Sequence, residues 1–295
     1  MPDESQDGPF HYQLFGLAVR SELELPELPG FHFEGEPDVV IRCGKGERGT
    51  LIAIDGIAEF SVSDGTMISV AAVPGASPRN IRLYLLGSAM GLLLHQRGLL
   101  PLHANAVEVG GRAIAFIGPS GSGKSTLAAW FHDNGYQVLA DDVCVVRFGA
   151  DDAPSVCPGL PRLRLWKEAL EASGRDAAHY ARSYAGDDDW EKFDVPLDQA
   201  GRPRASTPLA AIYLLAQGDL ATVDRLAGVE AADALFANTY RGRFVAEAGD
   251  PKMHWEACVR LVQSTPIFRA VRHWGLDRLE EESSRLLDHA RSLTA

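Results

Sequence analysis

The sequence predicts an α/β fold in two parts, a small β-rich N-terminal domain over residues 1–98 and an α/β domain over residues 99–295. Residues 10–78 contain short strand-like runs separated by turns. From residue 99 onward, apolar strands alternate with helical segments, the order typical of α/β domains. A glycine-rich loop lies between a strand and a helix of this second part, which is where phosphate-binding loops occur.

Composition and charge exclude several classes of protein. The chain has 295 residues and is 46% hydrophobic and 23% charged, as is usual for a globular protein. Its 28 Lys and Arg against 40 Asp and Glu give a net charge of −12. We therefore expect no binding to nucleic acid or to an anionic membrane, since both need a basic surface.

Cysteine spacing and the apolar runs bear on the compartment. The four cysteines have neither CxxC nor metal-binding spacing, which favours reduced thiols. The first ten residues are acidic and polar, unlike a signal peptide, and the longest apolar run is too short to span a bilayer. We expect a cytoplasmic protein.

A hairpin and a helix can be predicted in the N-terminal part. Asp64-Gly65 stands between two apolar runs and favours a tight turn, because glycine readily adopts the positive φ that such a turn needs. Residues 80–98 predict a mostly buried helix with Asn80 as its N-cap and Gly98 as its C-terminal stop. This part carries no recognisable chemistry, and its task stays open.

The second part can be divided into elements from its apolar runs. We expect residues 104–109 and 113–118 to form a hairpin around Gly110-Gly111, which would place His103 at the same end as the phosphate loop. The further expected elements are a helix over 125–135, strands over 136–140, 143–148 and 209–216, and two amphipathic helices within 253–289.

The strongest functional signal is the segment GPSGSGKS, which fits GxxxxGK[ST] at every fixed position. Its glycines let backbone N–H groups point inward, where they and the positive end of the following helix bind phosphate oxygens. Lys124 adds a mobile positive charge, and the Ser125 hydroxyl can ligate Mg²⁺. The predicted ATP-binding residues are Gly118, Pro119, Ser120, Gly121, Ser122, Gly123, Lys124, Ser125 and Thr126. The motif alone fits an ATPase, a GTPase, a small-molecule kinase or a protein kinase.

Asp141 and Asp142 follow Lys124 by only 17 and 18 residues. One helix and one short strand fit into that interval. We therefore expect both aspartates at the end of a strand that neighbours the phosphate-loop strand, close to the γ-phosphate. One carboxylate can hold Mg²⁺, and the other can accept the proton of an attacking hydroxyl. Either one could instead cap a turn or a helix.

Basic residues cluster after the aspartate pair. Arg162 and Arg164 stand two apart, so an extended segment would present both on one face. They could contact the nucleotide phosphates or a peptide carboxylate, or they could be solvated surface arginines. We expect Lys192-Phe193 on a mobile loop over the site.

The combination of His103, the phosphate loop and the aspartate pair resembles the HPr kinase/phosphorylase family. That pattern runs from histidine through a strand, GxSGxGKS, a helix, glycine and a strand to Ala-Asp-Asp, and residues 103–142 match it without a gap. The resemblance implies an HPr-kinase-type P-loop domain and an ATP-dependent serine kinase acting on a protein or peptide. It also implies that His103 and Lys124 are catalytic, that Ser125 binds Mg²⁺ and that Asp142 accepts the proton.

The chain also departs from that family. Thr126 stands where the family has Glu, and its EIRG and PVRPGRN segments have no clear counterpart, which argues against HPr as the substrate and against the reverse phosphorylase reaction. The opening YQLFGLAV…LPELP and the segment PGLPRLRLW are more similar to HPr-kinase-like proteins of peptide natural-product clusters. These include kinases of the C-terminal serine of lasso-peptide precursors.

We therefore predict transfer of the ATP γ-phosphate to a serine hydroxyl of a peptide or protein, and more narrowly of a lasso-peptide precursor. The predicted cofactors are ATP and Mg²⁺. Asp142, Asp141, His103 and Lys124 are the predicted catalytic residues, and Ser125 and Asp141 are the predicted metal ligands. A small-molecule kinase and a nucleotide-binding regulatory protein with little catalysis are the alternatives, and the acceptor, the choice of triphosphate and a homo-oligomeric state stay open.

Overall fold

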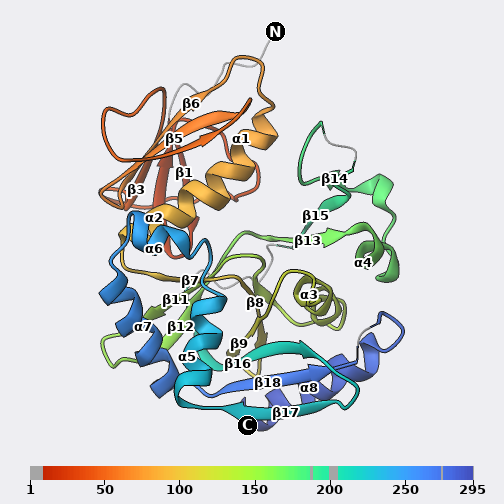
Figure 1. Ribbon diagram of the computed structural model, residues 1–295. Coiled ribbons are helices and arrows are strands. Elements are labelled where there is room, and N and C mark those ends of the chain that lie inside the picture. Colours follow the sequence, from red (N-terminus) through yellow and green to blue (C-terminus); the bar gives the residue numbers. More distant parts are fainter. Residues whose placement is uncertain (1–8, 187–188, 199–204, 274, 295) are drawn as a thin grey trace.

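A computed structural model describes residues 9–186, 189–198, 205–273 and 275–294 (Figure 1). Within these residues the protein is a mixed α/β structure with sheets of six, nine and three strands. The predicted division at residues 98 and 99 corresponds to a change from the first sheet and its helices to the larger sheet, but the boundary itself stays a prediction. No helix within the described ranges is long and apolar enough to cross a membrane.

The first sheet is built from the N-terminal strands in the order β1-β2-β3-β6-β5-β4. The predicted turn at Asp64-Gly65 is confirmed, since both residues have positive φ, 55° and 63°, and join the antiparallel strands β5 and β6. The strand bounds are β1 Phe10–Leu14, β2 Leu17–Ser21, β3 Val39–Cys43, β4 Thr50–Ile54, β5 Ala58–Ser63 and β6 Met67–Ala72.

The predicted buried helix is present and packs against this sheet, but its start differs from the prediction. It consists of α1 (Pro78–Tyr84), a π-helical segment (Leu85–Ala89) and α2 (Met90–Gln96). Asn80 as the N-cap was wrong: the cap is Ser77, because proline at the first helical position, Pro78, has a φ preset for a helix start. Asn80 lies inside the first turn. Gly98 follows the helix with φ 67°, as expected of a C-terminal stop.

The larger sheet has the order β10-β8-β9-β16-β12-β11-β7, and β18 pairs with both β16 and β17. The predicted hairpin of β8 and β9 is confirmed, with Ala104 opposite Ile117. Most pairs are antiparallel, but β16 runs parallel to both β9 and β18. The bounds are β7 Leu100–Leu102, β8 Ala104–Val109, β9 Arg112–Ile117, β10 Val138–Ala140, β11 Cys144–Phe148, β12 Pro154–Cys157, β16 Thr207–Gln217, β17 Thr222–Leu226 and β18 Ile267–Arg272.

The expected neighbour of the aspartate strand was wrong. β10, which precedes Asp141, pairs with β8 and not with the phosphate-loop strand β9, because the hairpin places β8 on that edge of β9 and β16 takes the other. The consequence for the site is small. Ala140 lies opposite Ala106, and Ala106 lies opposite Ala115, so the ends of β9 and β10 and the start of β8 still meet at one edge.

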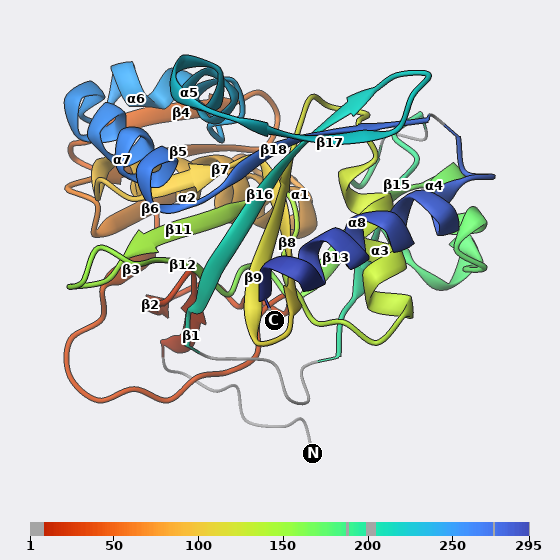
Figure 2. The same ribbon diagram turned by 90° about the horizontal axis from the view of Figure 1, so that it is seen from below.

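Helices cover both faces of the larger sheet (Figure 2). Along β9, Ile114 and Phe116 pack with α3 and α8, whereas Ala113, Ala115 and Ile117 pack with α5 and α7. This alternation follows from the two-residue period of a strand. The bounds of the helices are α3 Lys124–Asp133, α4 Lys167–Ala172, α5 Gly228–Ala237, α6 Arg243–Glu247, α7 Pro251–Ser264 and α8 Leu279–Thr294. The two amphipathic helices expected within 253–289 are α7 and α8.

A third, small sheet contains the basic stretch. It consists of β13 (Arg162–Trp166), β15 (Lys192–Pro196) and β14 (Ala181–Arg182), in the order β13-β15-β14. Lys192 does not lie on a loop as expected: it begins β15 and pairs with Trp166. Strand pairing therefore holds its backbone beside the site.

The first sheet and the larger sheet share one hydrophobic core. Its buried residues come from β1–β6 and the helix above them, and also from β11, β12 and the segment around α6, including Val145, Cys157 and Phe244. A second contact joins the helix to the segment after β14. The Asn80 amide donates to the carbonyl of Ala185 and accepts from its N–H, both at 2.8 Å.

We predict that Phe116→Ala lowers the free energy of unfolding by about 3–5 kcal/mol, because the ring is fully buried between Phe131 of α3 and Tyr213 of β16. Chemical denaturation measures the change. Leu51→Ala, at a side chain that is 58% exposed, is the control and should change stability by no more than about 0.5 kcal/mol. Equal effects of the two variants would contradict the described core.

Candidate active site

The phosphate loop connects the end of β9 to the start of α3. The loop turns back on itself through residues with positive φ, among them Gly118 at 150° and Gly123, the N-cap of α3, at 77°. A Cβ at position 118 would lie 2.9 Å from the Ser122 hydroxyl and 3.1 Å from the Leu215 carbonyl, so only glycine fits there without a shift. The loop leads directly into the N-terminal end of α3, which favours bound anions.

Lys124 lies across the inside of this loop. Its ammonium group donates to the carbonyl of Gly118 at 2.7 Å and to that of Pro119 at 3.1 Å. Burial lowers the pKa of Lys124 to about 8, even though the nearby carboxylates of Asp142 and Asp141 favour its charged form. A phosphate group bound in the loop would stabilise the charged ammonium group of Lys124, which burial disfavours.

Ser125 and Asp141 lie side by side behind the loop. The Ser125 hydroxyl donates to Asp141 Oδ1 at 2.9 Å, and the backbone N–H of Arg164 donates to Asp141 Oδ2 at 2.6 Å. Burial, together with the charge of Asp142, raises the pKa of Asp141. One hydroxyl and one carboxylate are the protein oxygens that Mg²⁺ commonly takes in nucleotide sites, where phosphates and water complete its shell. These two residues therefore fit the predicted metal site.

Asp142 is held by groups from two other segments. His103 Nδ1 donates to its carbonyl oxygen at 3.1 Å and lies 3.3 Å from Oδ1, and Arg164 Nη1 lies 3.2 Å from Oδ2. Burial pushes the pKa of Asp142 upward, but the His103 hydrogen bond and the Arg164 charge outweigh burial and hold it below its usual range. Asp142 has φ 73°, a conformation that aspartate tolerates better than most residues do.

A cavity of about 110 Å³ lies between the phosphate loop and this cluster. The structure thus brings most of the predicted site residues together around one space. Three predicted catalytic or ATP-binding residues do not line this cavity. Asp141 is hydrogen-bonded to Ser125, which does line it, and Gly118 and Pro119 are the first two residues of the loop. The lining residues are His103, Asn105, Ser120, Gly121, Ser122, Gly123, Lys124, Ser125, Thr126, Asp142, Leu165, Trp166, Ala169 and Lys192.

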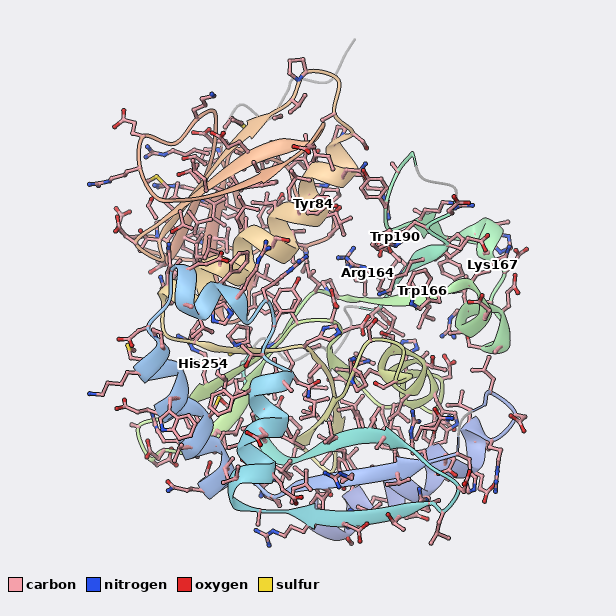
Figure 3. All side chains as sticks on the ribbon, in the orientation of Figure 1. Tyr84, Arg164, Trp166, Lys167, Trp190 and His254 are labelled. Carbon is pink, nitrogen blue, oxygen red and sulfur yellow. The ribbon has the colours of Figure 1, made fainter. Side chains whose placement is uncertain are left out.

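The two arginines of β13 are not solvated, so the surface interpretation was wrong. The side chains of Arg162 and Arg164 are only 12% and 14% exposed, and both approach the carboxylate of Asp194. Arg164 reaches Asp142 in addition, whereas Arg162 does not line the phosphate cavity. In Figure 3, Arg164 and Trp166 lie along β13, between the helix that carries Tyr84 and the helix that follows the phosphate loop.

Residues that the sequence did not predict hold the site in place. Asn238, the C-cap of α5, accepts a hydrogen bond from the Gly118 N–H through Oδ1 at 2.8 Å, and its carbonyl accepts from the His103 N–H at 2.7 Å. Arg272, at the end of β18, donates to the carbonyl of Ser122 at 2.7 Å. The partners are separated by at least 120 residues in each case, and no local pattern marks such contacts.

Comparisons with known proteins add little. No family model and no curated protein matches the sequence. One similar solved structure is titled "Structure of the Hpr(Ser) kinase/phosphatase from Coxiella burnetii"; it has a TM-score of 0.34 and 10% sequence identity, and covers 66% of this chain and 99% of that chain. Similarity at this level assigns neither a family nor an activity to the chain.

We predict that Asn238→Ala destabilises the protein by about 1–3 kcal/mol, because the Gly118 N–H is left buried without its acceptor. Denaturation and nucleotide titration measure the effect on stability and on the loop. Asn134→Ala is a matched control: Asn134 is also a helix C-cap, and its amide also donates to the carbonyl four residues earlier. A nucleotide affinity reduced equally in both variants would contradict a specific role of Asn238.

Proposed function

We propose that the protein is an ATP-dependent kinase that transfers the γ-phosphate to a serine hydroxyl of a peptide or protein. One observation carries the proposal: Lys124 of the phosphate loop and the carboxylate of Asp142 line one cavity. Ser125 lines the same cavity, and its hydroxyl donates to Asp141, which lies behind it. Binding of phosphates, a metal position and a carboxylate for the acceptor hydroxyl are the parts that phosphoryl transfer needs.

The residues divide these tasks as follows. Loop N–H groups and Lys124 bind the phosphates, and Ser125 and Asp141 would hold Mg²⁺, which would neutralise phosphate charge. The serine oxygen forms a bond to the γ-phosphorus, and the bond from that phosphorus to the β–γ bridging oxygen breaks. ADP leaves with the electron pair of that bond, and the serine proton passes to Asp142.

The low pKa of Asp142 is compatible with this role. Because His103 and Arg164 hold the carboxylate ionised, it can accept a hydrogen bond from the hydroxyl and orient it. In a loose transition state the hydroxyl loses its proton late, when the new bond to phosphorus has made it more acidic. A strong base is then less important than a well-placed acceptor. His103 and Arg164 act by positioning Asp142.

A groove supports a peptide rather than a small metabolite as the acceptor. It measures about 600 Å³ and lies between the N-terminal part and the β13–β15 sheet. Its residues mix prolines and apolar groups with charges: Pro26, Glu27, Leu28, Pro29, Arg79, Arg82, Pro161, Arg162, His179, Tyr180, Ala181, Asp194, Pro196 and Leu197. A small-molecule kinase would instead need an enclosed acceptor pocket beside the phosphate loop.

The charges of this groove favour a carboxylate-bearing chain end. Three arginines of the groove, Arg79, Arg82 and Arg162, accompany its two carboxylates, Asp194 and Glu27, and Asp194 also contacts Arg164 at 3.5 Å. Arg164 in turn contacts Asp142, which connects the groove to the transfer site by two ion pairs. The C-terminal serine of a lasso-peptide precursor, with its free carboxylate, is the narrower acceptor that we propose.

We expect Asp142→Asn to lower kcat for transfer by roughly 10²–10⁴-fold and to leave ATP binding largely intact, because the amide cannot take the proton. Radiolabel transfer and calorimetric titration measure the two properties. Asp133→Asn, at the far end of α3, removes a carboxylate paired with Arg175 and serves as the control. Transfer at a near wild-type rate in Asp142→Asn would show that the assigned base is wrong.

We further expect phosphate on a peptide that ends in serine, detected by mass spectrometry after incubation with Mg-ATP. Replacing that serine by alanine should abolish the product. Amidation makes the peptide's C-terminus neutral, so the arginines of the groove lose the negative charge with which they would pair. We expect KM to rise roughly tenfold, which corresponds to about 1.4 kcal/mol. ATP hydrolysis without phosphate on any peptide would favour the nucleotide-binding regulatory alternative.

A further inference from the structure

Asn105 combines complete burial with unused hydrogen-bonding groups. It lies on β8, two residues after His103, and its exposure is 0%. Within the described part of the chain, neither its side-chain Oδ1 nor its Nδ2 has a hydrogen-bond partner. Two other buried asparagines differ in this respect: both Asn80 and Asn238 donate and accept through their side chains.

The strand position of Asn105 is one that an apolar residue would normally take. Asn105 shares a strand face with Val107 and Val109, both of which pack in the core that includes α3. Buried polar groups in native proteins nearly always have partners, because an unpaired buried amide costs free energy. An asparagine here needs a reason other than the stability of the ligand-free protein.

Asn105 is one of the residues that line the phosphate cavity. Asn105 shares this cavity with Lys124, Ser125, His103 and Asp142. Asp142 already offers an acceptor for the attacking hydroxyl, so the phosphate is the partner that can use the amide donors of Asn105, in addition to the loop N–H groups. An amide has two N–H donors and carries no charge of its own, so it can stabilise negative charge without adding a further cation to the cluster.

We propose that the Asn105 side-chain amide donates a hydrogen bond to an oxygen of the γ-phosphoryl group, which makes Asn105 a catalytic residue. The inference rests on the proposed function in that its ligand is a nucleoside triphosphate. The bond strengthens as charge develops on the phosphoryl oxygens during transfer. The free protein keeps the amide unpaired, and the nucleotide supplies the missing acceptor.

The test compares Asn105→Leu with wild-type protein in three measurements: unfolding temperature without ligand, Kd for Mg-ADP and for a non-hydrolysable Mg-ATP analogue, and kcat for transfer. Leucine has the same number and branching of side-chain heavy atoms as asparagine, and it removes the unpaired amide. We therefore expect an unfolding temperature at or above that of wild type, unchanged ADP binding and at least tenfold weaker binding of the ATP analogue. We expect kcat to fall by roughly 10²–10³-fold, as on loss of one preorganised donor.

Asn80→Leu is the matched control. It makes the same change at a buried asparagine whose amide is paired, so its unfolding temperature should fall while the ratio of the two Kd values stays as in wild type. Asn105→Ala adds no bulk and replaces Asn105→Leu if that variant does not fold.

The outcomes separate this inference from the proposed function. A lower unfolding temperature of Asn105→Leu with an unchanged Kd ratio and kcat would overturn the inference and make Asn105 a structural residue. Weakened ADP binding together with an unchanged Kd ratio would also overturn it, since the contact would then not involve the γ-phosphate. Wild-type protein that binds neither nucleotide would overturn the proposed function itself, and with it this ligand for Asn105.

Discussion

The pairing of β8 with both β9 and β10 is the constraint on which the site depends. With Ala104 opposite Ile117 and Ala106 opposite Ala140, His103 precedes one strand at the edge where the phosphate loop and Asp141 leave the other two. A slip of one residue would turn the faces of β8 over and would bury different side chains against α3. Asn238 secures this edge from outside the sheet, because it bonds the backbone of both Gly118 and His103. The geometry of the cavity therefore follows from strand register before any side-chain chemistry is considered.

Asp141 and Asp142 are adjacent in sequence and occupy opposite electrostatic environments. The side chain of Asp141 is directed toward Ser125, and burial raises its pKa. Asp142 has a positive φ, and its side chain is directed toward His103 and Arg164, which lower its pKa. Neighbouring carboxyl groups with pKa values moved apart are suited to different tasks. One can serve a metal and the other an acceptor hydroxyl without competing for the same proton.

Local patterns predicted the local parts of this structure. The loop between β9 and α3, the turn at Asp64-Gly65 and the β8–β9 hairpin each depend on a few consecutive residues and were confirmed. The strand beside β9 could not be predicted from spacing, because it depends on which edge the hairpin occupies. Arg162 and Arg164 could have been surface residues until β15 placed Asp194 opposite them. Asn105 looks like an ordinary strand residue in the sequence; only its burial without a partner, a property of the folded protein, singles it out.

The net charge of −12 and the predicted binding of a triphosphate are compatible because the charges are unevenly distributed. Lys124, Lys192 and Asp142 line the cavity, and Asp141 and the ion pairs of Arg162 and Arg164 with Asp194 lie next to it, so four cations accompany three carboxylates in a largely buried cluster. Burial lowers the pKa of both lysines, which means that each would gain from a nearby anion. A bound polyphosphate would supply that anion in a buried position, where water screens charges least. Arg79 of the N-terminal part joins the same cluster through Asp194, so the first 98 residues complete the electrostatics of the site as well as sharing its core.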